Sequence, residues 1–177
     1  QQGSAEGRNY FCPVGLVNYE DGLWIRNRES ELNVSARFSI DSVSGMESHY
    51  NVAGKLAGYE NPEKMVIISG HYDTVMTAGF DDNGAGTAGV LEIAKTLTKE
   101  VQAGFYRPKY TILFIAFASE ELGLIGSINY VRMHKSEMSN IVAVVNLDCI
   151  GSDELRFSET NSVGQFDLDQ ALLEAAQ

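Results

Sequence analysis

The segment Gly70-His71-Tyr72-Asp73-Thr74-Val75 decides how the rest of this sequence is interpreted. It follows Met65-Val66-Ile67-Ile68-Ser69, a short apolar run with a β-branched centre, which is typical of a buried strand. In open α/β sheets, ligand sites form just outside the carboxyl ends of such strands. A second polar stretch, Gly79-Phe80-Asp81-Asp82-Asn83-Gly84, comes next. One histidine, several carboxylates and flexible glycines favour a metal site, although a polar loop with an incidental histidine has the same composition.

Composition and charge limit the class of protein. The 177 residues are 44% hydrophobic, which suffices for one globular domain with its own core. The formal net charge of -11 argues against a nucleic-acid partner, because such proteins present a basic face. No apolar run is long enough to span a membrane. The polar start of the sequence does not resemble a signal peptide, but a mature secreted chain has also lost it. Our expectation is a secreted or periplasmic location rather than a cytoplasmic one.

The two cysteines, Cys12 and Cys149, are too few for a disulfide framework. Cys149 stands next to a predicted strand, and we expect a small buried apolar side chain there. Nothing in the sequence supports a bridge between the two.

The residues before the opening segment predict β-structure. Glu20-Asp21-Gly22 stands between two apolar runs, 14–19 and 23–26, as in a hairpin. Alternating polar and apolar residues predict a half-buried strand over 34–40, and a further strand is expected over 50–57. We expect these to add antiparallel strands at one edge of a sheet.

The residues after it alternate between helices and apolar strands. The predicted elements are a helix over 88–98, a buried strand over 110–117, a helix over 125–134, a buried strand over 141–147 and a last helix over 167–176. This order predicts an α/β fold, with a mostly parallel mixed sheet, helices on both faces and antiparallel strands at one edge. With no repeat and no linker, residues 1–177 are expected to form a single domain, unless 1–49 is the tail of a preceding module.

Chelating residues follow each of the three most apolar strands. They are His71 and Asp73 after the first, Glu120 and Glu121 after the second and Asp148 after the third, with Asp81 and Asp82 in the loop that leaves the first. If the strands are parallel, all of these side chains meet at one edge. So many carboxylates would repel one another without a cation, and one or two metal ions relieve that repulsion. A carboxylate base beside metal-activated water is the chemistry of hydrolysis.

The adjacent pair Glu120-Glu121 also has a simpler explanation. Taken alone, two acidic residues there are better explained as the first turn of a helix, where negative charge favours the macrodipole. Placed opposite His71 and Asp82, the pair instead suggests a metal ligand beside a base.

Four motifs in this sequence closely resemble those of the di-zinc exopeptidases, a family that includes bacterial leucyl aminopeptidases and glutamate carboxypeptidases. The similarity runs from about Tyr50 to Gly151 in the order and spacing of the family. It implies a zinc-exopeptidase-like (phosphorylase/hydrolase-like) fold. The motifs are Gly70-His71-Tyr72-Asp73-Thr74-Val75, Phe80-Asp81-Asp82-Asn83-Gly84-Ala85-Gly86, Ala118-Ser119-Glu120-Glu121-Leu122-Gly123-Leu124-Ile125-Gly126-Ser127 and Asn146-Leu147-Asp148-Cys149-Ile150-Gly151.

The resemblance also implies a role for each site residue. His71 and Asp148 look like ligands of one zinc, Asp82 like the carboxylate that bridges two zincs, Glu121 like a ligand of the second zinc, Glu120 like the general base and Asp73 like the carboxylate that orients His71. The peptide between Asp82 and Asn83 is often cis in this family. Asp81 is then a loop carboxylate.

One departure from the family concerns the second zinc. Its last ligand in the family is a histidine from a later loop, and a late tyrosine helps to hold the oxyanion, yet nothing after Gly151 supplies either. His49 precedes the first motif, and His134 is expected at the surface end of a helix, so both are weak candidates. We therefore expect a C-terminally incomplete catalytic domain in which one of two zinc ions is lost.

The sequence thus predicts a zinc-dependent exopeptidase that acts on peptide substrates, an aminopeptidase by family frequency. The alternatives are a glutaminyl-cyclase-like zinc acyltransferase and a catalytically inactive homologue. A calcium loop is a third alternative, since Asp81, Asn83, Gly86 and Glu92 have the spacing of an EF-hand, but Ala85 occupies a ligand position.

Overall fold

The structure is a computed structural model of the chain, and it describes residues 16–28, 37, 39, 45–75 and 78–152. The chain divides into two compact units, one over Glu6–Ser48 and a larger one that contains His49–Gln177. The predicted helix over 167–176 and most of the predicted strand over 34–40 lie outside the described residues. The single-domain assignment and the alternative for 1–49 stay predictions.

The smaller unit contains a helix where the sequence predicts a hairpin. Helix α1 (Tyr19–Asn27) begins after Asn18, whose side chain accepts a hydrogen bond from the backbone N–H of Asp21 at 2.8 Å. This is an N-cap, and Glu20 and Asp21 place negative charge in the first turn, where the helix dipole favours it. The hairpin prediction is wrong over these residues because the cap and the acidic turn outweigh the turn signal of Asp-Gly. Gly22 lies inside the helix.

The larger unit is built on a four-stranded mixed sheet with the order β1-β3-β2-β4. Strand β1 (Val52–Leu56) pairs antiparallel with β3 (Tyr110–Phe117) at one edge. Strand β2 (Asn61–His71) lies parallel to β3 and to β4 (Ile141–Asn146). The predicted α/β fold, mostly parallel with an antiparallel strand at one edge, is confirmed.

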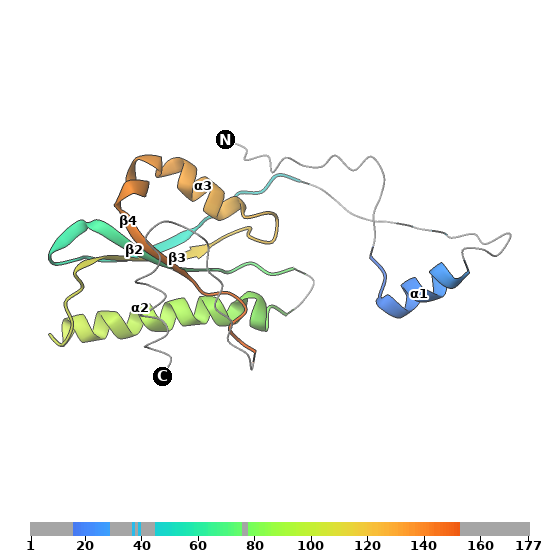
Figure 1. Cartoon of the computed structure of the whole chain (residues 1–177), viewed down its shortest axis with the longest axis horizontal. Helices are drawn as coiled ribbons and strands as arrows, with labels where there is room; N and C mark the ends of the chain where they lie inside the picture. Colours follow the sequence, from blue (N-terminus) through green and yellow to red (C-terminus); the bar gives the residue numbers. More distant parts are fainter. Residues whose placement is uncertain (1–15, 29–36, 38, 40–44, 76–77, 153–177) are drawn as a thin grey trace. The chain divides into compact units, whose positions relative to one another are not determined.

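Helices lie on both faces of this sheet. Helix α2 (Gly86–Gln102) runs along one face, and α3 (Ile125–Met133) lies on the other, as Figure 1 shows. A kinked segment, η1 (Phe80–Ala85), in which Asp82 and Asn83 have non-helical backbone angles, leads into α2. A 3-10 segment, η2 (Lys135–Asn140), leads into β4. This alternation follows from the strand order, since right-handed crossovers in opposite directions place their helices on opposite faces.

The core packs α2 against the middle of the sheet. Val90 of α2 contacts Ile112 and Phe114 of β3, and all three are buried. On β3, Ile115 is fully buried. Apolar burial between helix and sheet is the main stabilising contribution in such a layer.

Strand β4 is less buried than the sequence predicts. Its residues alternate between partly buried and exposed, and Val142 and Val144 are 52% and 51% exposed. The prediction of a fully buried strand is wrong here because β4 is the outer strand of the described sheet. Among the described residues, no helix is long and apolar enough to cross a membrane.

Replacing Ile115 tests how much the sheet depends on its packed centre. We expect Ile115→Ala to lower the free energy of unfolding by about 2–5 kcal/mol, because it removes transfer energy and leaves a cavity. Leu91→Ala is the control, since Leu91 is 65% exposed and its loss should change stability by less than about 0.5 kcal/mol. Urea denaturation followed by circular dichroism measures both. Equal stabilities of the two variants would contradict this description of the core.

Candidate metal centre

The centre forms where three parallel strands end at the same edge. The register pairs His71, the last residue of β2, with Phe117, the last residue of β3. On the other side of β2, Ser69 pairs with Asn146, the last residue of β4. Chains leaving β3 and β4 therefore pass the end of β2.

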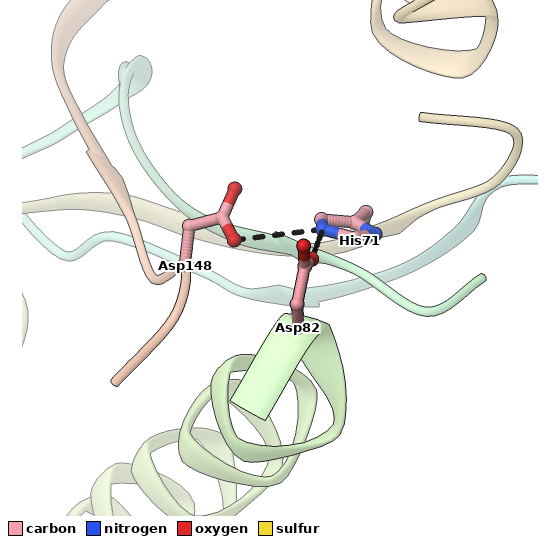
Figure 2. A group of neighbouring side chains, drawn as sticks. All are labelled: His71, Asp82 and Asp148. Atoms are coloured by element: carbon pink, nitrogen blue, oxygen red, sulfur yellow. Dashed lines mark ion pairs between the residues drawn. The ribbon is translucent and has the colours of Figure 1, made fainter. Parts of the chain in front are cut away.

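The structure brings together three of the predicted metal ligands, His71, Asp82 and Asp148, as Figure 2 shows. His71 Nε2 lies 3.0 Å from Asp82 Oδ1 and 3.5 Å from Asp148 Oδ1. One potential ligand atom from each residue lies within 4.8 Å of the others. The imidazole is 3% exposed, while both carboxylates reach solvent. One imidazole nitrogen and two carboxylate oxygens, open to solvent on one side, fit a zinc-type ion with room for water.

The other nitrogen of His71 is fixed by Asp73. His71 Nδ1 lies 3.0 Å from the backbone carbonyl oxygen of Asp73 and 3.5 Å from its carboxylate Oδ1. A proton on Nδ1 therefore has an acceptor, which leaves the lone pair of Nε2 for a metal. On the backbone side, Thr87 Oγ1 donates to the carbonyl oxygen of His71 at 2.6 Å.

Asp73 also holds the start of the loop that follows β3. Its Oδ1 accepts the backbone N–H of Glu120 at 3.0 Å, and its Oδ2 accepts that of Glu121 at 3.2 Å. One carboxylate thus links the orientation of His71 to the position of the Glu120-Glu121 pair.

The carboxyl group of Glu120 lies beside the three-residue group. Its Oε2 is 3.8 Å from His71 Nε2. The pKa of Glu120 is raised, first by burial and then by the neighbouring charges of Asp148, Glu121 and Asp73, although His71 works in the opposite direction. A carboxylate with a raised pKa is suited to accept a proton from a nearby water molecule.

The pKa of His71 is shifted by the same neighbouring charges. Burial lowers its pKa, but the charges of Asp148, Glu120 and Asp82 and the hydrogen bond to Asp73 outweigh that effect, so the pKa is raised overall. A group of carboxylates that favours a proton on this imidazole favours a divalent cation in its place.

The sequence profile of peptidase family M28 matches residues 51–176. The chain belongs to this family. It is 33% identical over 119 residues to a protein named probable zinc metalloprotease from Pyrenophora teres f. teres, a match that covers 62% of this chain and 24% of that protein. It is 32% identical over 143 residues to a protein named aminopeptidase from Pseudomonas aeruginosa, covering 79% of this chain and 25% of that one.

A solved structure shares the fold. The aminopeptidase from Aneurinibacillus sp. strain AM-1 superposes with a TM-score of 0.51 at 30% identity, over 58% of this chain and 25% of that chain. This M28 chain thus spans about a quarter of the length of the relatives described here. The predicted membership of the zinc exopeptidases is confirmed.

Glu121, a predicted site residue, and Asp81, a predicted loop carboxylate, do not join the three-residue group of this M28 chain. The carboxylate of Glu121 is not among the potential metal ligands that converge in the described part of the chain. Its assignment to a second metal stays a prediction. Asp81 accepts the backbone N–H of Gly151 at 2.7 Å, a contact that suits a loop carboxylate.

The two remaining histidines do not join the group either. The ring of His134 stacks on Tyr130 with centroids 4.2 Å apart, and its Nδ1 lies 2.9 Å from the Tyr130 carbonyl oxygen. His49 Nδ1 contacts the hydroxyl of Ser119.

Cys149 is exposed, which corrects the prediction of a buried residue. Strand β4 ends at Asn146, so Cys149 lies in the following loop rather than beside the sheet, and it is a free thiol. Its pKa is raised to about 11 by desolvation and by a hydrogen bond to Asp148.

Asn83 is a structural residue of the centre whose role the sequence did not reveal. Its side chain is 1% exposed, Nδ2 donates to the carbonyl oxygen of Leu147 at 2.8 Å, and Oδ1 accepts the backbone N–H of Gly86 at 3.0 Å. The preceding peptide bond, Asp82-Asn83, is cis, as the family resemblance implies. Asn83 therefore ties the loop of Asp82 to the residue before Asp148.

Asn83 and the backbone of Leu147 lie so close to Gly86 that no side chain fits at that position. A Cβ there would lie 2.2 Å from Asn83 Oδ1 and 2.3 Å from the Leu147 carbonyl oxygen.

The structure does not support the alternative of a calcium-binding loop. Both polar atoms of Asn83 are bound to the chain, and Glu92 pairs with Lys95 at 2.9 Å on the exposed face of α2.

Replacing Asn83 tests whether this tie sets the metal affinity. We expect Asn83→Ser to weaken zinc binding by about 10–100-fold, the usual cost of losing a group that supports metal ligands. Asn140→Ser, at the end of η2, is the matched control and should leave the affinity unchanged. Competition with a fluorescent chelator measures both constants. A folded Asn83→Ser protein with unaltered zinc affinity would show that the hydrogen bonds of Asn83 do not set that affinity.

Proposed function

We propose that this chain is the metal-binding part of a zinc-dependent exopeptidase, with an aminopeptidase as the preferred activity. The observation that carries the proposal is the convergence of His71, Asp82 and Asp148, with the Glu120 carboxyl group 3.8 Å from the imidazole. The family match and the names of its relatives, zinc metalloprotease and aminopeptidase, support it.

In this proposal, His71, Asp82 and Asp148 hold the zinc ion. A zinc ion held by these residues would supply a Lewis acid that makes a water molecule more acidic. Glu120 would serve as the group that takes a proton from the attacking water and returns it to the leaving amine, the usual work of a general base that becomes a general acid. Asp73 keeps the Nδ1 proton of His71 in place and positions the backbone of Glu120.

For a second zinc ion, this chain offers one proposed ligand, Glu121. We place the protein outside the cytoplasm as a proposal only.

A glutaminyl-cyclase-like acyltransferase is the second candidate. The observation behind it is that His71, Asp82 and Asp148 form a group that could hold one zinc ion, which is all that a one-zinc enzyme needs. The products separate the two, because a cyclase releases ammonia from an N-terminal glutamine and a peptidase releases an amino acid.

Replacing Glu120 tests the proposed chemistry. We expect Glu120→Gln to keep zinc but to slow the hydrolysis of aminoacyl anilides by about 100-fold or more, since general-base catalysis contributes about 10²–10⁴-fold. Glu92→Gln, on the exposed face of α2, should match the wild type. Metal analysis and initial rates, with and without a chelator, give both quantities.

The result can also reverse the assignments. If Glu120→Gln lost zinc in parallel with turnover, Glu120 would be a ligand and Glu121 the base. A wild-type protein without bound zinc and without chelator-sensitive hydrolysis would refute the proposed function.

A further inference from the structure

Three consecutive residues, His49, Tyr50 and Asn51, lie just before β1 and contact the loops at the metal centre. We call them the clamp segment. None of them has a role in the proposed chemistry. The clamp segment faces the loop 118–126, which follows β3 and carries Glu120 and Glu121.

Asn51 joins the two ends of that loop. Its Oδ1 accepts the backbone N–H of Ala118 at 3.0 Å, and its Nδ2 donates to the carbonyl oxygen of Gly126 at 2.9 Å. Ala118 and Gly126 are both buried, so without Asn51 these backbone groups would lose a partner away from solvent. Leaving such groups unpaired costs more than the net value of the hydrogen bond itself.

The two loop ends are packed closely around the Asn51 amide. A Cβ on Gly126 would lie 2.2 Å from the carbonyl oxygen of Ala118 and 2.5 Å from Asn51 Oδ1. The absence of a side chain at Gly126 therefore lets one amide bridge both ends.

The other members of the clamp segment contact the same region. His49 Nδ1 contacts the hydroxyl of Ser119, which is 3% exposed, has a φ of 54° and directly precedes Glu120. The hydroxyl of Tyr72, next to His71, donates to the carbonyl oxygen of Tyr50 at 2.8 Å.

The loop is thus held from two sides. Asp73 holds the backbone N–H groups of Glu120 and Glu121, and the clamp segment holds the residues before and after them. The three converging metal ligands lie on other segments, at the end of β2, in η1 and after β4.

We infer that Asn51 is a positioning residue for Glu120, which acts by closing the loop 118–126 through Ala118 and Gly126. The inference rests on the proposed function of Glu120 as the base. A general loss of folding would disturb both the position of Glu120 and the zinc ligands. Loss of Asn51 should displace Glu120 while the zinc ligands stay in place.

The experiment compares Asn51→Ala with Asn51→Asp in the full-length protein. For Asn51→Ala, we expect amide hydrogen exchange in 118–126 to become about tenfold faster, from the loss of two hydrogen bonds, and exchange in 65–70 to stay unchanged. Zinc affinity should stay within about threefold, while kcat falls about tenfold or more and KM changes little, because a displaced catalytic group costs turnover.

Asn51→Asp keeps the acceptor for Ala118 but cannot donate to Gly126. We expect exchange at Ala118 to stay slow, while the Gly126 end of the loop is released and kcat falls, because the carboxylate faces the Gly126 carbonyl oxygen. This variant also keeps the test available if Asn51→Ala does not fold. Lys55→Ala, at an exposed position of β1, is the control and should match the wild type in every measurement.

Two outcomes would overturn the inference. The first is wild-type exchange and kcat in folded Asn51→Ala. The second is a zinc affinity that falls in parallel with kcat, since Asn51 would then support the whole centre. A wild-type protein without zinc-dependent hydrolysis would refute the proposed function instead, and hydrogen exchange would still report whether Asn51 closes the loop.

Discussion

Parallel pairing of β2 with both of its neighbours is the constraint on which the centre depends. Since β3 and β4 end beside the end of β2, the loops that leave them must pass His71. No local property of Glu120 or Asp148 brings them to the imidazole. Their meeting follows from the direction and the register of the strands. A shift in the register of β4 against β2 would move Asp148 away from His71.

Strand direction alone does not hold negative side chains together. Acidic residues on neighbouring loops repel one another, and a loop has few contacts of its own to oppose this. In the described part of the chain, the loops are instead bound to each other through polar side chains that are buried (Asn83) or partly buried (Asp73 and Asn51). Asp73 links β2 to the loop after β3, Asn83 links η1 to the end of β4, and Asn51 closes the loop after β3. Such support is what keeps a site preorganised.

The sequence predicted those features that depend on strong local patterns. Apolar runs gave β3 from Tyr110 to Phe117 and placed β4, and their common direction followed from the alternation with helices. Because the chelating residues directly follow these runs, the convergence of His71, Asp82 and Asp148 could be expected before any geometry was known.

Features that depend on competition or on distant contacts were harder to predict. In α1, an asparagine cap competed with a turn signal, and the cap prevailed. The exposure of Val144 depends on which strands pair, which a single apolar run does not report. Asn51 and Asn83 carry no pattern of their own, because their value arises from backbone groups 75 and 64 residues away along the chain.

These asparagines also explain why the centre can tolerate exposed carboxylates. Each amide offers a donor and an acceptor, so one side chain can bind two backbone groups that point in opposite senses. No buried side-chain nitrogen or oxygen atom in the described residues lacks a hydrogen-bond partner. A carboxylate in place of Asn83 would set negative charge against the carbonyl oxygen of Leu147 and add to the repulsion around Asp82. The neutral amide therefore connects the acidic loops without increasing the charge that a bound cation must neutralise.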